Sequence, residues 1–234
     1  MIVSHGLYAQ EETIFLSGEI HAVTGYTPWK SFQNFRKEYN TTNAESISNK
    51  LGSLSPQYGF AAGLDCFVSN HLYCAVDYMN LSSRTRASFT NGAQRLIQAN
   101  TKIINSNIGW LQPTTSGYWT LTTGFSAAFG NLKSFIEFPD GTRYKHTSGL
   151  SGEFHDVNIG ISLNFEWNKQ LSDRIFWRTG ASTNFFFETT DLGMQNTFVT
   201  QTAGSLSLNS TQVNYDISGL TIYTGLAFKL YILE

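Results

Sequence analysis

The stretch Phe-His-Asp-Val-Asn-Ile-Gly-Ile-Ser-Leu-Asn-Phe-Glu-Trp, residues 154–167, decides the fold class. From Val157 onward every second residue is apolar, and the residues between are polar or glycine. Successive side chains of a β-strand point to opposite faces, so this alternation predicts a strand with one apolar and one polar face. The stretch exceeds the mean strand length of about 5–6 residues. It reaches the roughly 9–11 residues that a tilted strand needs to cross a bilayer.

The same alternation recurs along the chain. It predicts eight strands, at 13–24, 57–67, 71–82, 117–129, 132–138, 154–167, 174–188 and 216–232. The predicted short turns lie at 69–71, 130–131 and 168–173, and the predicted long loops at about 26–55, 84–116, 143–153 and 189–214. Short turns at one end and long loops at the other are typical of outer-membrane barrels. We therefore predict an all-β fold, an antiparallel up-and-down transmembrane β-barrel of about eight strands. Ten strands remain open, because Pro139-Asp140-Gly141 would form a turn that divides 132–147.

Composition narrows the class further. The chain has 234 residues, of which 14% are charged and 15% aromatic, and its formal net charge is −2. The slightly negative net charge excludes a broad basic surface that would bind nucleic acid. The sequence contains no apolar run of about 18 residues, the length expected of a transmembrane helix. Residues 1–10 resemble the end of a signal peptide, and 11–234 are predicted to form a single barrel domain.

The polar face of the predicted strands is rich in small residues, as a narrow lumen requires, and poor in the Lys and Glu of soluble sheets. Aromatic residues lie near both strand ends, which predicts two aromatic girdles. The girdle by the short turns comprises Phe67, Phe129, Trp167, Trp177 and Tyr231, and the girdle by the long loops comprises Tyr58, Tyr78, Trp119, Phe185 and Phe187. A soluble, lipocalin-like ligand-binding barrel, with the apolar face inside, remains an alternative.

Three segments carry a family resemblance: Gly-Phe-Ala-Ala-Gly-Leu (59–64), Leu-Tyr-Cys-Ala-Val-Asp-Tyr (72–78) and Tyr-Thr-Gly-Leu-Ala-Phe-Lys-Leu-Tyr (223–231). The chain resembles the small, eight-stranded outer-membrane β-barrel proteins of Gram-negative bacteria. The resemblance to these porin-like barrels implies that the protein is located in the bacterial outer membrane. It also implies contact with outer-membrane lipid and lipopolysaccharide.

Charged residues on the polar face form the main candidate site. They are Glu19, His21, Asp65, Asp77, Lys133, Glu137, Asp156, Glu166, Arg178, Glu188 and Lys229. An eight-stranded barrel is just wide enough to be filled by side chains, so we expect a charge network that plugs the lumen. A proton or cation path, or an ion held by the excess of carboxylates, is the alternative. The sequence shows no cofactor motif and no convincing metal-ligand set.

One cluster points to catalysis. His146-Thr147-Ser148 precedes Glu153 and Asp156. It resembles the His-x-Ser of the outer-membrane lipid A deacylases, although this chain has Gly149 where that family has Asn. The resemblance implies a lipid hydrolase with Ser148 as nucleophile, His146 as base and Asp156 as acid.

The first long loop contains a helical pattern. Segment 31–52 places Phe32, Phe35 and Tyr39 on one side of a short helix. We interpret the segment as a solvated surface loop, with a lid or a contact surface for a partner as the alternatives. The leading function is non-enzymatic: a structural or interaction role through the surface loops, with a protein partner there. Whether Cys66 and Cys74 are bonded stays open, with two free thiols favoured.

Overall fold

The computed structural model describes residues 14–69, 71–144, 151–187, 189–198 and 210–233. These residues form nine strands and one helix: β1 Ile14–Tyr26, α1 Lys30–Thr42, β2 Ile47–Asn49, β3 Gln57–Phe67, β4 Leu72–Phe89, β5 Gln94–Thr114, β6 Gly117–Glu137, β7 Gly152–Gln170, β8 Ile175–Phe186 and β9 Gly219–Leu233. Within this part of the chain, no helix has the length and apolar character needed to cross a membrane.

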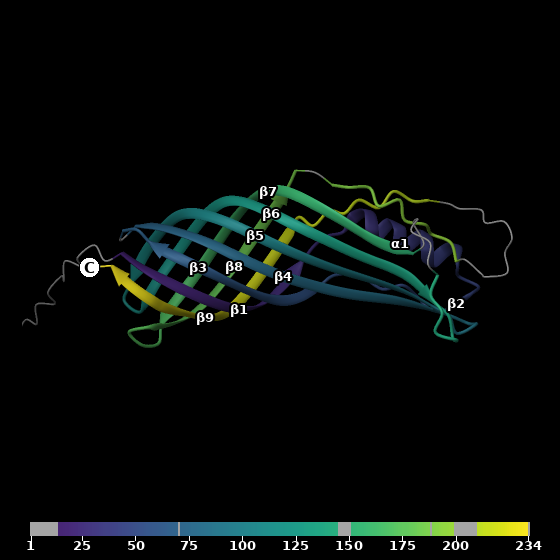
Figure 1. Cartoon of the computed structure of the whole chain (residues 1–234), viewed down its shortest axis with the longest axis horizontal. Helices are drawn as coiled ribbons and strands as arrows, with labels where there is room; N and C mark the ends of the chain where they lie inside the picture. Colours follow the sequence, from purple (N-terminus) through teal and green to yellow (C-terminus); the bar gives the residue numbers. More distant parts are fainter. Residues whose placement is uncertain (1–13, 70, 145–150, 188, 199–209, 234) are drawn as a thin grey trace, which may run out of the picture.

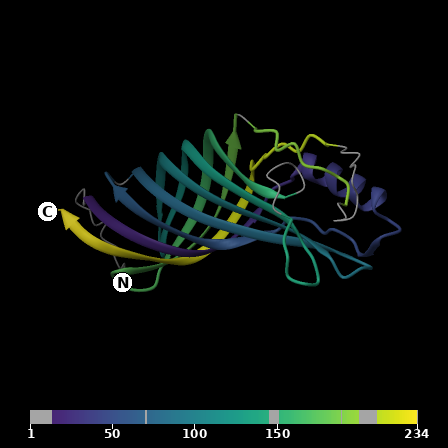
Figure 2. The same ribbon diagram turned by 45° about the vertical axis from the view of Figure 1, so that its right-hand side comes forward.

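Eight of the strands form a closed ring. The order β4-β3-β1-β9-β8-β7-β6-β5 is closed by pairing of β5 with β4, all neighbours are antiparallel, and β2 pairs with β4 outside the ring. Figure 1 shows the tilted strands, with β1 and β9 side by side. Figure 2 shows that β4 to β7 extend well beyond the other strands at one end. The prediction of an antiparallel up-and-down barrel of about eight strands is confirmed.

One predicted loop and one predicted turn are wrong. The first error omits a strand and the second adds one, so the predicted number of strands is unchanged. The predicted loop 84–116 holds the end of β4, a turn at 90–93 and the whole of β5. The predicted turn at 130–131 lies inside the continuous strand β6. A Cβ at Gly130 would lie 1.9 Å from the Tyr215 ring, so glycine here allows a close approach rather than a turn.

The Pro139-Asp140-Gly141 turn is present but does not add strands. Gly141 has a φ of 80°, and the amide of Phe138 donates to the Thr142 carbonyl at 2.9 Å. In the described residues after this turn, pairing back to β6 is limited to a bridge between Glu137 and Arg143.

Along the long strands, the inward side chains change from polar to apolar. In the first half of β6, Thr120, Thr122 and Ser126 are buried inside, whereas Phe125 points outward and is 74% exposed. In the second half the inward residues are apolar, as Leu132 shows. The inside–outside period is unbroken, but the surroundings change from lipid to water on the outer face. Because of this reversal, neither face of β5 stays apolar along its length, and β5 was therefore predicted as part of a loop.

The membrane half of the barrel carries the apolar belt. Outward side chains there include Leu64, Ile159, Ile222 and Leu230, each at least 57% exposed. Such a continuous apolar surface is far larger than a soluble monomer exposes. The lipocalin-like alternative, which needs this face inside, is therefore wrong.

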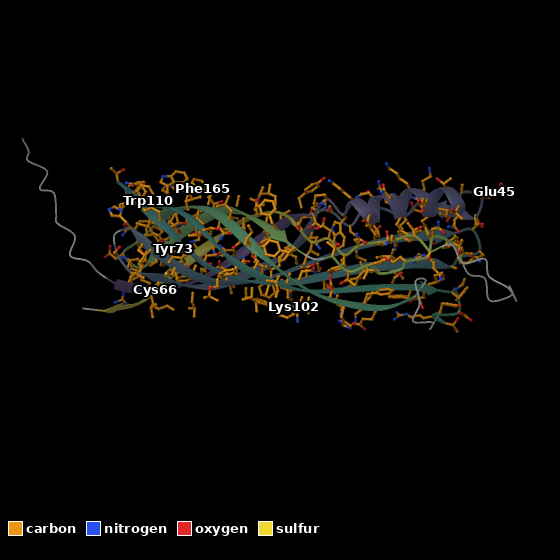
Figure 3. The ribbon with its side chains drawn as sticks, turned by 90° about the horizontal axis from the view of Figure 1, so that it is seen from above. Glu45, Cys66, Tyr73, Lys102, Trp110 and Phe165 are labelled. Carbon is orange, nitrogen blue, oxygen red and sulfur yellow. The ribbon has the colours of Figure 1, made fainter. Side chains whose placement is uncertain are left out.

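The predicted aromatic girdles need a correction. Trp119 lies beside the short turn at 115–116, where its ring centroid is 6.0 Å from that of Trp167, and Phe129 lies near the outer boundary. The two residues exchange ends because β6 starts at the short turn and continues past 130. Phe67 is 3% exposed and points into the barrel rather than into a girdle. Figure 3 shows Trp110 and Phe165 near the end of the barrel that holds Cys66, with Glu45 at the far end beyond Lys102.

The outer half, formed by the ends of β4 to β7 beyond the belt, is covered by α1 and by residues 190–198 and 210–217 (Figure 1). Phe32, Phe35 and Tyr39 of α1 are fully buried against this half. The predicted helix and its apolar side are confirmed. The interpretation of 31–52 as a solvated loop is wrong, since the inward apolar residues of the extended strands need this cover.

Candidate functional site

The lumen of the membrane half holds an ionic cluster centred on Arg178 of β8. The guanidinium is fully buried and forms ion pairs with Glu19 of β1, with Asp65 of β3 at 2.7 Å and with Glu166 of β7 at 3.7 Å. Period-two alternation points all four side chains inward, and closure of the ring brings them together. A buried arginine is tolerated only when it is paired and hydrogen-bonded, so the cluster fixes the packing of the lumen.

Three tyrosines complete the hydrogen bonding of this cluster. Tyr73 Oη donates to Asp65 at 2.6 Å, Tyr223 Oη donates to Glu166 at 2.7 Å, and Tyr118 Oη accepts from Arg178 at 3.3 Å. None of the three was predicted to be a site residue. Their signal was present, however: each is a tyrosine on the polar face of its alternating strand.

An aromatic layer closes the lumen at the short-turn end. The ring of Phe67 lies 5.1 Å from that of Tyr73 and 5.3 Å from that of Tyr118, and Tyr118 lies 5.5 Å from Phe176. Lys229 is half-buried at this end, with Nζ 4.8 Å from the centre of the Phe15 ring. The aromatic layer therefore separates Lys229 from the Arg178 cluster.

His21 and Asp77 lie further along the lumen. His21 Nε2 is 2.9 Å from Glu19 Oε2, and Asp77 Oδ2 accepts from Asn107 at 3.0 Å. One carboxylate oxygen each of Glu19, Asp65 and Asp77 lies within 4.8 Å of the others. The sequence-predicted lumen residues Glu19, His21, Asp65, Asp77, Glu166 and Arg178 are thus brought together.

The other predicted lumen charges lie elsewhere. Lys133 and Glu153 form a 3.0 Å pair on the outer surface, and Glu137 pairs there with Arg143 at 2.9 Å. The placement of Lys133 and Glu137 in the lumen is wrong, because the polar face of β6 turns outward beyond the belt. Asp156 accepts from Asn158 at 2.7 Å near that boundary. Glu188 lies outside the described residues.

The predicted hydrolase residues His146 and Ser148 also lie outside the described residues. Their third member, Asp156, is engaged by Asn158 and by the Thr190 hydroxyl. Cys66 and Cys74 face each other across β3 and β4 as free thiols.

Arg95 anchors the cover of the outer half. It is fully buried, with its guanidinium 5.1 Å from the centre of the Phe35 ring and 4.8 Å from that of Tyr39, and it donates to the Gln195 carbonyl at 2.8 Å. Burial raises the pKa of Tyr39, and the charge of Arg95 partly opposes that shift. Arg95 therefore joins strand β5, helix α1 and the chain near 195.

A closed ring of eight antiparallel strands, apolar outside and polar inside, defines a small outer-membrane β-barrel. This class places the chain in the outer membrane.

Three solved structures of this class are similar to the chain. OprG from Pseudomonas aeruginosa shares 8% identity at a TM-score of 0.52, with 94% of this chain and 96% of OprG covered. Ail, the attachment invasion locus protein of Yersinia pestis, shares 9% identity at a TM-score of 0.45, with 94% and 99% covered. Neisserial surface protein A shares 11% identity at a TM-score of 0.35, with 92% and 97% covered. No protein-family model matches the sequence, and neither does any curated protein. At these identities the likeness concerns the fold alone.

Proposed function

We propose that the protein is a non-enzymatic outer-membrane barrel with a plugged lumen, which acts through its outer surface. The observation that carries the proposal is the filling of the interior. The aromatic layer around Tyr118, the Arg178 cluster and the apolar contacts of α1 follow one another along the barrel. Filling at three levels supports a role other than conduction or passage of solutes.

Planar-bilayer recording tests the plug. The refolded protein is expected to give no unitary conductance steps, and a general diffusion porin reconstituted in the same way serves as the positive control. Regular steps that persist in several preparations would contradict the plugged lumen. Incubation with purified lipid A, followed by mass spectrometry, tests the non-enzymatic assignment: released acyl chains that disappear in Ser148→Ala would replace it with the hydrolase.

The surface just above the belt supports lipopolysaccharide as a partner. Arg84, Arg86 and Lys102 are exposed on the outer face of β4 and β5. Lys102 is the register partner of Phe129, so the basic residues begin where the lipid-facing aromatic residues end. Cations at the height of lipid headgroups attract phosphate. We name Arg84, Arg86 and Lys102 the basic rim.

A charge-matched pair of variants tests the basic rim. Replacing Arg84, Arg86 and Lys102 by Gln is expected to lower, several-fold, the amount of lipopolysaccharide retained by the folded barrel on gel filtration. The control replaces Lys30, Arg36 and Lys37 of α1 by Gln, which removes the same charge away from the belt. An equal loss of lipopolysaccharide in both variants would show that retention depends on net charge alone, which would contradict the basic rim as the binding surface. We also propose that a protein partner binds the outer half of the barrel. The partner would contact the exposed side of α1, which carries Lys37 and Glu38.

A further inference from the structure

The Arg178 cluster contains more acid than base. Four inward carboxyl groups, from Glu19, Asp65, Asp77 and Glu166, lie together in the membrane half, and Arg178 forms ion pairs with three of them, Glu19, Asp65 and Glu166. Full ionisation would leave a large negative charge in a site shielded from water, which is strongly unfavourable. The site therefore needs protons or a further cation.

Arg178 does not face all of the acidic oxygens. It contacts Glu19 Oε2 and Asp65 Oδ2, whereas Glu19 Oε1 and Asp77 Oδ1 face the backbone of Gly63. A Cβ at position 63 would lie 2.5 Å from each of these two oxygens. Asp77 Oδ1 is buried and accepts no hydrogen bond from the described residues. Because Gly63 has no side chain, these two carboxylate oxygens can lie close against its backbone, where a Cβ would displace them.

A small cavity lies beside these two carboxyl groups. It has a volume of about 10 Å³ and is lined by Glu19, Asp77, His21 and Asn105, among others. A space of this size holds one water molecule or one ion. His21 is 3% exposed and Asn105 is 1% exposed, yet His21 Nδ1 and Asn105 Nδ2 have no hydrogen-bond partner in the described part of the chain. Two buried polar groups without partners indicate that something else occupies the cavity.

We infer that the lumen binds one divalent cation of the Ca²⁺ type between Glu19 and Asp77. Ca²⁺ is coordinated by carboxylate oxygens at about 2.3–2.6 Å and readily retains water ligands. Two oxygens within 4.8 Å of each other can both bind one such ion. The cavity then holds its water, which accepts from Asn105. This site is independent of the basic rim and of the role of the outer surface.

Equilibrium dialysis against Ca²⁺ tests the site. The full chain is refolded into a zwitterionic detergent without lipopolysaccharide, so that no ion is carried by lipid phosphate. The expected result is one tightly held Ca²⁺ per folded barrel, and a higher temperature for loss of the barrel fold with Ca²⁺ than with EDTA. Absence of bound Ca²⁺ from the unchanged protein would overturn the proposal in favour of shared protons.

Gly63→Ala is the most specific variant. Its Cβ would displace Glu19 Oε1 and Asp77 Oδ1, and these nearest atoms belong to side chains rather than to the backbone, so the barrel is expected to fold while Ca²⁺ binding falls at least tenfold. Gly25→Ala is the matched control, because its Cβ meets a flexible leucine end at 3.0 Å away from the acids. If Gly63→Ala does not fold, Asp77→Asn replaces it as the test. Loss of Ca²⁺ binding by folded Asp77→Asn would support the site. Retention of the ion by either folded variant would place it elsewhere.

Discussion

Removal of the Arg178 charge is the sharpest test of how the lumen is held together. Arg178→Met keeps an unbranched side chain in a fully buried position but leaves Glu19, Asp65 and Glu166 without their shared cation. Breaking a buried ion pair from one side costs about 3–5 kcal/mol, because the remaining charge is buried unpaired. The three hydrogen bonds to Tyr73, Tyr118 and Asn168 are lost as well. We therefore expect the free energy of unfolding to fall by about 3–5 kcal/mol.

The assay is urea unfolding of the barrel refolded in detergent micelles, followed by tryptophan fluorescence and by the shift of the folded band on unheated gels. Lys133→Met is the control, since its pair with Glu153 is 43% and 44% exposed. An exposed pair of this kind contributes about 0–1 kcal/mol.

A double-variant cycle with Glu19→Gln separates pairing from packing. If the Arg178–Glu19 pair carries the cost, Arg178→Met loses less stability in the Glu19→Gln background, with a coupling of about 0.5–3 kcal/mol. A loss below 1 kcal/mol in Arg178→Met, or strict additivity with Glu19→Gln, would refute the claim that this cluster fixes the lumen.

Three other outcomes follow from the structure. Phe35→Ala, at a fully buried position of α1, is expected to cost about 3–5 kcal/mol of packing, and limited proteolysis of the folded barrel should then cut within α1 while the membrane half stays protected. Phe125→Arg on the lipid side should cost about 2–4 kcal/mol, whereas Asn131→Arg, on the water side of the same strand, should change the unfolding free energy by less than about 0.5 kcal/mol; equal costs would contradict the reversal of faces. Hydrogen bonds from Asn131 and Lys133 hold the pKa of Glu153 below its usual 4.5. The contact of Glu153 with Lys133 should therefore persist at pH 4.5 and disappear as the pH falls through the lowered pKa. A carboxyl NMR titration measures this change.

The sequence predicted the membrane half of the barrel well, because there the pattern and the surroundings agree along each strand. In 154–167 every outward residue from Val157 to Phe165 meets lipid, and every inward one meets the lumen. The inward charges Glu19, Asp65 and Arg178 were found for the same reason. The outer half was predicted poorly. In β5, Ile97 is buried inside and Ile104 is exposed outside, so no single apolar face marks that strand.

Alternation of residues by itself determined which side chains share a face of a strand, because the strand has a period of two in any surroundings. It did not determine what each face meets. The closed ring decided that Glu19, Asp65 and Arg178, distant in sequence, share one buried site, and the cover by α1 decided that Leu132 lies inside while Lys133 lies in water. Those outcomes depend on which medium surrounds each stretch of the strand, and only the packed tertiary structure supplies that medium.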